Sequence, residues 1–186
     1  MQHKYLKLFL IAMFCLWLSG LQAQTIRDID GNVYKTVTIG KQVWMAENLK
    51  TSKYNDGRAI PLVTDNTAWE ALNTPAYCWY DNDESANKTK CGALYNWFAV
   101  NTNKLCPTGW HVPNDREWTN LPPLSGGYRY ADGTFYYIKD YSYWWTTTES
   151  SITSAYYNQV FWDGSDVKRD QSVKKDGFSV RCLKNK

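Results

Sequence analysis

The sequence has few of the residues on which metal sites and acid–base catalysis most often depend. Its 186 residues include only 2 histidines and 5 cysteines. It contains no glycine-rich phosphate loop and no twelve-residue EF-hand pattern, which argues against the commonest nucleotide and calcium motifs. After residue 21, no apolar run approaches the roughly twenty residues that cross a bilayer, so we expect no membrane span.

The first 23 residues are typical of a secretory signal peptide. Two lysines precede an apolar stretch from Leu8 to Leu21, and Ala23 offers a small residue for cleavage. Cys15 lies inside the apolar stretch and not at the cleavage point, so we expect no lipid anchor. We therefore predict a signal peptide over residues 1–23 and export of the remainder to the medium, the periplasm or the cell surface.

The charge balance argues against nucleic acid and anionic membranes as partners. The formal net charge is +3, and removing the two lysines of the predicted signal peptide lowers it from +3 to +1. A chain with so little excess charge lacks the electrostatic footprint of those partners. Residues 24–186 have the length of one domain with a substantial core, and we predict a single domain there.

Four cysteines lie in the predicted domain. An even number of cysteines in an exported chain favours two disulfide bonds. The sequence alone allows three pairings of Cys78, Cys91, Cys106 and Cys182.

Aromatic residues are abundant, with 10 Trp and 14 Tyr. They are densest between Tyr128 and Trp162, where they alternate with small and polar residues. Short segments bounded by turn residues predict antiparallel strands, both after Thr25 and in the C-terminal third. The C-terminal strand candidates are the segments GTFYYI, YWWTTTE, AYYNQVFW and GFSVRCL.

Two or three helices are predicted between these groups of strands. The first covers Asp65–Leu72, with Asp65 or Asn66 as its N-cap. The second begins at Gly92 and ends near residues 101–104. The third begins at Asn114, where Glu117 completes a capping box and Trp118 packs back on the preceding turn.

Seven segments of the sequence together resemble those of a known family. They are YKTVTIGKQVWMAENLKT, AYCWYDND, GALYNWFAVN, LCPTGWHVPNDREW, SGGYRYADGTFYYI, YWWTTTES and GFSVRCLK. In this order they resemble the segments of the Fibrobacter succinogenes major paralogous domain family, found in exported proteins of Bacteroidetes-type bacteria. That family is similar to the formylglycine-generating enzymes, a branch of the C-type lectin-like architecture. The resemblance implies an α+β fold of short antiparallel strands with two or three helices, stabilised by disulfide bonds. The chain departs from the family in its middle, where TNLPPL joins two motifs that are usually much further apart.

The resemblance suggests how the cysteines pair. Cys106 precedes the third helix and Cys182 lies in the closing strand, so these two are expected to be joined, which pairs Cys78 with Cys91. A bridge across the longer loop would contribute about 4 kcal/mol to stability. A bonded Cys182 also leaves no reactive cysteine pair of the kind that the oxidase relatives use to bind copper.

Catalysis would have to use His111, the only histidine after the predicted signal peptide. Its neighbours suggest a residue built into the turn before a helix. Asp115 and Glu117 could form a glycosidase-type pair, but carboxylates in a first helical turn are typical of capping. We therefore predict no catalytic residues, with an enzyme derived from the formylglycine-generating branch as the alternative.

Two acidic turns, YDNDE at 80–84 and DGSD at 163–166, offer the oxygen ligands that calcium prefers. Neither has EF-hand spacing, and the lectin signatures EPN and WND are absent. We expect no cofactor, with calcium at these turns as the alternative.

The C-terminal aromatic residues are the candidate binding site. Tyr143, Trp144 and Trp145 cannot all point inward from one strand, so some rings should be exposed beside polar residues. The alternative is that they fill an irregular core. Related lectin-like proteins vary in this region, so the resemblance also implies a binding surface here. We predict a non-catalytic module for an extracellular carbohydrate or protein. The candidate ligand-binding residues are Tyr143, Trp144, Trp145, Tyr156, Tyr157, Trp162, Asp163, Asp166 and Arg169.

Overall fold

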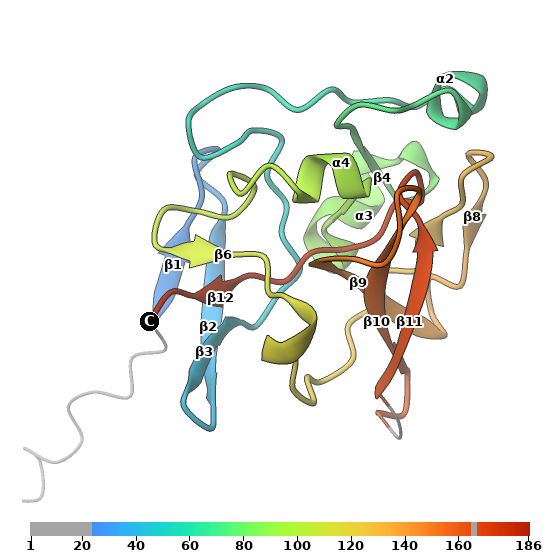
Figure 1. The fold of residues 1–186 in the computed structure, drawn as a ribbon. Helices are drawn as coiled ribbons and strands as arrows, with labels where there is room; N and C mark the ends of the chain where they lie inside the picture. Colours follow the sequence, from blue (N-terminus) through green and yellow to red (C-terminus); the bar gives the residue numbers. More distant parts are fainter. Residues whose placement is uncertain (1–23, 165–166) are drawn as a thin grey trace, which may run out of the picture.

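The computed structural model describes residues 24–164 and 167–186 (Figure 1). The predicted signal peptide over residues 1–23 lies outside the described residues. The fold is α+β, with many short strands and few helices. The strands are β1 (Thr25–Arg27), β2 (Val33–Ile39), β3 (Gln42–Met45), β4 (Tyr77–Trp79), β5 (Ala93–Tyr95), β6 (Trp110–His111), β7 (Tyr128–Arg129), β8 (Phe135–Tyr136), β9 (Tyr141–Glu149), β10 (Ser154–Phe161), β11 (Val167–Val173) and β12 (Leu183–Lys184). The helices are α2 (Asn66–Glu70), α3 (Glu84–Cys91) and α4 (Trp97–Val100), with the 3-10 helices η1 (Tyr80–Asn82) and η2 (Asp115–Glu117).

Among the described residues, no helix has both the length and the apolar character needed to cross a bilayer.

The first sheet joins both ends of the described chain. Its five antiparallel strands have the order β1-β2-β3-β12-β6, and Leu183 of β12 pairs with Trp44 on one side and His111 on the other. In Figure 1 the dark red β12 accordingly lies beside the blue β3 and the yellow-green β6. The predicted antiparallel unit near the N-terminus is confirmed, and the sequence did not indicate that the last strand completes it.

A disulfide bond fixes this arrangement. Cys106 and Cys182 are joined, with their Cα atoms 6.0 Å apart and a sequence separation of 76 residues. Both residues are buried. The predicted pairing is confirmed, and in the chain-entropy model a crosslink over a loop of this length contributes about 4 kcal/mol.

Residues 177–183 form a central segment that connects the two larger sheets. The N–H of Phe178 donates to the carbonyl of Tyr95 at 3.1 Å, and the N–H of Tyr95 donates back at 2.9 Å. Further along, the N–H of Ser179 donates to the carbonyl of Tyr143 on β9, and the N–H of Leu49 donates to Val180. The same few residues thus supply hydrogen-bond partners to segments far apart in the sequence.

The second sheet packs its aromatic side chains around the central segment. Its strand order is β11-β10-β9, all antiparallel. The ring of Phe178 lies 4.4 Å from Trp145, 5.4 Å from Tyr143 and 4.7 Å from Tyr157 between centroids. Aromatic pairs at these separations add about 0.5–1.5 kcal/mol each beyond the burial of their surface.

Two buried arginines bind carbonyl oxygens. The guanidinium of Arg129 donates to the carbonyls of Val63 at 2.6 Å and Thr64 at 2.9 Å. Arg181 donates to the carbonyl of Met45 at 2.7 Å, and burial lowers its pKa to about 10. A guanidinium has five N–H donors and can therefore tie several backbone segments together. Arg129 in this way anchors β7 and the hairpin that follows it.

The predicted helices are shorter than expected, and one lies elsewhere. Asp65 caps α2 as predicted, accepting a hydrogen bond from the N–H of Ala68 at 2.8 Å. The helix predicted from Gly92 is wrong over residues 93–95, which form β5 against β4 because their backbone pairs with residues 77–79. Helix α4 begins only after Asn96, whose side chain caps it.

One further helix and one further strand lie in polar segments and were not predicted from the sequence. No helix was predicted over residues 84–91, but they form α3, with Asp83 as N-cap. The strand β11 was missed because Lys, Arg, Asp and Gln occupy its middle, as is usual for an exposed edge strand.

The predicted disulfide between Cys78 and Cys91 is wrong, because both thiols are free and buried. Cys78 lies on β4 opposite Leu94, and burial raises the pKa of its thiol to about 12. Cys91 ends α3, where its sulfur lies 3.9 Å from the side-chain oxygen of Asn87. The thiol of Cys91, at the end of α3, therefore has different neighbours from the thiol of Cys78 on β4.

These two free thiols provide a quantitative test. We expect residues 24–186, unfolded in denaturant without reductant, to react with Ellman's reagent at two thiols per chain, and the native protein to react at none because both thiols are buried. After reduction, four thiols should react. A value of zero or four in unreduced denatured protein would contradict the cysteine assignment.

Candidate functional site

The three consecutive aromatic residues predicted as an exposed platform are buried. Tyr143 is 6 % exposed, and Trp144 and Trp145 are both 0 % exposed. The prediction of a platform at these positions is therefore wrong, and the alternative of an aromatic core holds for them. Tyr157 also packs against this core, although it is only partly buried.

Both faces of β9 are covered, which explains this burial. Tyr143 and Trp145 point into the main core around Phe178. Trp144 points the other way, where its indole N–H donates to the side chain of Asn48 at 2.7 Å and its ring lies 5.5 Å from that of Trp118. Trp118 thus packs on other indole rings, whereas the sequence predicted that it packs back on the preceding turn.

Two other candidate residues connect the second sheet to η2. The guanidinium of Arg169 pairs with the carboxylate of Asp115 and lies 3.5 Å above the ring of Tyr156. Because alternate residues of a strand face opposite sides, Tyr156 points away from Tyr157 and Phe161. Tyr156 and Arg169 consequently have a structural contact on the other face of the sheet from the rings described next.

A continuous aromatic surface lies at the end of the β9–β10 hairpin and beside β8. Neighbouring ring centroids are 6.0 Å apart for Tyr136 and Tyr137, 5.7 Å for Tyr137 and Tyr141, 5.0 Å for Tyr141 and Phe161, and 6.1 Å for Phe161 and Trp162. Among these five rings, the three most exposed are Tyr136 at 40 %, Tyr137 at 50 % and Trp162 at 64 %. We call these five residues the aromatic surface.

The backbone places one of these rings at a conformational cost. Tyr137 has φ of 58°, in the left-handed region that bulky side chains rarely occupy. Its carbonyl accepts hydrogen bonds from the N–H groups of Asp140 and Tyr141. Nearby, Gly127 also has positive φ, and a Cβ there would lie 2.4 Å from the carbonyl oxygen of Tyr136. Glycine at 127 therefore lets the loop approach the strand that carries the tyrosines.

A hollow of about 270 Å³ adjoins the aromatic surface. The hydroxyl of Ser142 binds both the N–H and the carbonyl of Leu124, which fixes the loop on one side. Trp162 and Tyr141 supply rings, and Lys139 supplies a cation. The hollow is lined by Pro123, Leu124, Ser125, Lys139, Tyr141, Ser142 and Trp162. The structure thus brings Trp162 to a hollow, next to the exposed Asp163, whereas Asp166 lies outside the described residues.

Sequence reasoning missed Tyr136, Tyr137, Tyr141 and Phe161 as members of this surface. Two of them follow a turn in the segment ADGTFYY, which forms a two-residue strand in a two-stranded sheet. So small a sheet covers few side chains, and adjacent tyrosines on it were the available signal of exposure.

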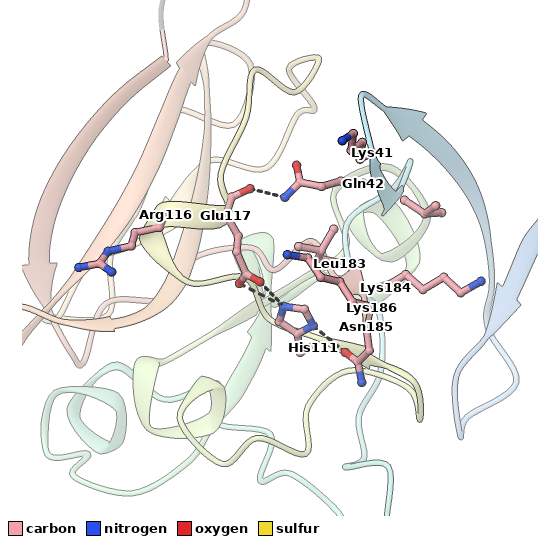
Figure 2. A pocket seen from close by; sticks show the side chains of 10 residues that line it. Lys41, Gln42, His111, Arg116, Glu117, Leu183, Lys184, Asn185 and Lys186 are labelled. Atoms are coloured by element: carbon pink, nitrogen blue, oxygen red, sulfur yellow. Dashed lines mark hydrogen bonds and ion pairs between the residues drawn. The ribbon is translucent and has the colours of Figure 1, made fainter.

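His111 lies in a second, larger cavity of about 510 Å³ (Figure 2). Its Nε2 lies 3.1 Å from a carboxylate oxygen of Glu117, and its Nδ1 lies 2.6 Å from Oδ1 of Asn185. The carboxylate of Glu117 also accepts a hydrogen bond from the N–H of Asn114, completing the predicted capping box. The side chain of Gln42 donates to the carbonyl of Glu117, as Figure 2 shows.

In the first acidic turn, over residues 80–84, Asp83 has structural partners. Asp83 accepts hydrogen bonds from the N–H of Ala86 and the hydroxyl of Ser85. Within residues 24–164 and 167–186, no group of three or more His, Cys, Asp or Glu side chains is arranged to hold a metal ion.

The carboxyl group of Asp176, which lies shortly after β11, is buried. Asp176 is 1 % exposed, and burial raises its pKa to about 6 although the hydroxyl of Ser172 donates to it. Its other oxygen, Oδ1, is buried without a hydrogen-bond partner. A folded-state pKa above the unfolded value means that folding favours the protonated form.

Asp176→Asn should therefore change how stability depends on pH. The contribution of Asp176 to the stability of the wild type falls as pH rises from about 4 to about 6, while the neutral amide does not titrate, so the variant should gain up to about 3 kcal/mol relative to the wild type between pH 4 and pH 7. Urea unfolding of both proteins at pH 4, 5, 6 and 7 measures the difference. Asp140→Asn, an exposed carboxylate, is the control. A difference between wild type and Asp176→Asn that is constant with pH would contradict the assignment.

No curated protein and no solved structure matches the chain. Residues 37–126 match the family model described as the Fibrobacter succinogenes major domain. The matched region begins within β2, contains His111 and Glu117, and stops just before the first residues of β7, so the aromatic surface lies beyond it. This match supports the assignment of residues 37–126 to the Fibrobacter succinogenes major domain family.

Proposed function

We propose that this protein is an exported, non-catalytic binding module that holds a carbohydrate on its aromatic surface. The observation that carries the proposal is the unbroken contact of rings from Tyr136 to Trp162, with three of them exposed. Core packing does not require a row of exposed rings, and contiguous exposed apolar groups are typical of binding sites.

The size of the exposed rings favours a carbohydrate over a protein ligand. An aromatic side chain has about 150–250 Å² of surface, so the three rings together expose about 300 Å². A standard protein interface buries about 800 Å² on each partner. A sugar ring has a flat C–H face of suitable size to stack on Tyr or Trp, and its hydroxyls can bond to the polar tips of those side chains.

The hollow beside Trp162 supports the same ligand class. Ser125 and Lys139 place polar groups next to the rings of Tyr141 and Trp162. A sugar unit stacked on Trp162 would have hydrogen-bond partners within reach on the loop that Ser142 holds in place. The combination of flat rings and a polar rim is what orients a polar, ring-shaped ligand.

Export and the lectin-like relationship are part of this proposal. The composition of residues 1–23 supports export, and a disulfide bond is typical of oxidising compartments. The mixture of short strands with few helices is compatible with a C-type lectin-like architecture.

Of the groups that an enzyme of the formylglycine-generating branch would use, Cys182 and His111 have other partners, and the free thiols of Cys78 and Cys91 are buried. Cys182 is in a disulfide bond, and both ring nitrogens of His111 lie against side-chain oxygen atoms. No serine, threonine or cysteine lines the His111 cavity within the described residues. These contacts support a non-catalytic module.

Substitution of exposed rings tests the proposal. Binding to a glycan array, followed by calorimetry with the glycans found, should show affinity reduced about tenfold by Trp162→Ala and by Tyr137→Ala, because each removes a stacking surface. Tyr137→Phe keeps the ring and should retain most of the affinity. These residues are exposed, so the variants should fold with stability changed by about 0.5 kcal/mol or less.

Ile152→Ala is the matched control, because Ile152 is 91 % exposed and lies in the turn at the opposite end of the β9–β10 hairpin. It should bind like the wild type. Glycan binding that survives both Trp162→Ala and Tyr137→Ala would contradict the proposed surface. Binding of a protein and no glycan through these residues would contradict the ligand class.

A further inference from the structure

We propose that the His111 cavity is a second binding site, for a small organic anion whose carboxylate or sulfate group is held by the basic side chains around it. The site shares no residue with the aromatic surface and does not depend on the proposed function. The cavity lies between the β2–β3 turn, η2 and the C-terminal segment, as Figure 2 shows.

Positive charge gathers around this cavity. Four cationic side chains line it, and none of them forms a salt bridge with a described residue. They come from three separate parts of the chain, so the clustering is made by the fold. The cations are Lys41, Arg116, Lys184 and Lys186. The lining therefore carries four cationic side chains and one acidic one, Glu117.

The one acidic side chain that lines the cavity, Glu117, offsets part of this positive charge and leaves an excess of cations. The carboxylate of Glu117 lies against His111 at 3.1 Å and accepts the N–H of Asn114 at 2.9 Å. Like charges around a recess repel one another, and that repulsion is relieved when an anion enters. A cleft lined by one sign of charge also raises the local concentration of the opposite ion.

The framework of the cavity is held by backbone contacts. His111 pairs with Leu183 across β6 and β12, beside the disulfide bond of Cys182. The N–H of Asn185 donates to the carbonyl of Gly109 at 2.9 Å, so the C-terminal segment remains attached to the start of β6 beyond β12. A site with a fixed framework loses little entropy on binding.

The size and lining of the cavity indicate an organic ligand. A volume of about 510 Å³ is within the roughly 300–1,000 Å³ of small-molecule sites and is much larger than a lone inorganic oxyanion requires. Val43 and Leu183 add apolar lining, while Gln42 and Asn185 add side-chain amides. An acidic monosaccharide or a similar organic acid matches these groups.

His111 is a convenient reporter, because it is the only histidine in residues 24–186. We would record its imidazole signals by NMR while adding sodium glucuronate, sodium sulfate, glucose or sodium chloride at constant ionic strength. Glucuronate should shift the signals saturably, and sulfate should do so more weakly. Glucose and chloride should have no effect.

Removal of charge identifies the binding groups. The double variant Lys41→Gln/Lys184→Gln should weaken glucuronate binding at least tenfold. The control Lys90→Gln/Lys168→Gln removes the same charge from exposed lysines of α3 and β11, and it should bind like the wild type. Trp162→Ala should also bind glucuronate normally here, which separates this site from the aromatic surface.

Any of the following results would overturn the proposal. One is that glucuronate causes no saturable shift, or that chloride causes the same shift as glucuronate. Another is that glucose binds as strongly as glucuronate, or that the double variant binds glucuronate with full affinity. Binding of sulfate without glucuronate would indicate a site for a free inorganic ion and would also overturn it.

Discussion

The central segment over residues 177–183 is the constraint on which the rest of the structure depends. It has almost no regular secondary structure, yet its backbone pairs with β5, β7 and β9, and its last residues join the first sheet. Phe178 then serves as the centre around which the rings of both β9 and β10 pack. The disulfide at Cys182 prevents the segment from leaving this position.

This arrangement divides the aromatic residues into two populations. Rings that reach the central segment, such as Trp145 and Tyr157, are packed in the core, and Trp144 is buried on the opposite face. At the end of the β9–β10 hairpin away from its turn, Tyr141 and Phe161 are partly exposed and Trp162 is exposed. The proposed ligand surface therefore consists of aromatic side chains that are not fully packed into the core.

The sequence predicted features that depend on neighbouring residues. The caps at Asp65 and Asn114 were found because a side chain binds an N–H two or three residues away. Strand pairs in the C-terminal third followed from aromatic segments between turns. Helix length was overestimated at Gly92, because hydrophobic spacing suits a helix while the tertiary pairing of β5 with β4 decides the outcome.

Features that depend on contacts between residues far apart in the chain could largely not be predicted from the sequence. Exposure of Trp162 and burial of Trp144 differ because of what packs on each, and alternation along a strand could not reveal that both faces of β9 are covered. The pairing of Cys106 with Cys182 was suggested by the family resemblance, whereas the same reasoning failed for Cys78 and Cys91, which α3 separates.

The division of the aromatic rings into buried and exposed groups can be measured directly by hydroxyl-radical footprinting with mass spectrometry on native protein. The account predicts rapid oxidation of Trp162, Tyr136 and Tyr137, and strong protection of Trp144 and Trp145 until the protein is unfolded. Oxidation of Trp144 or Trp145 in the native protein as fast as that of Trp162 would contradict it.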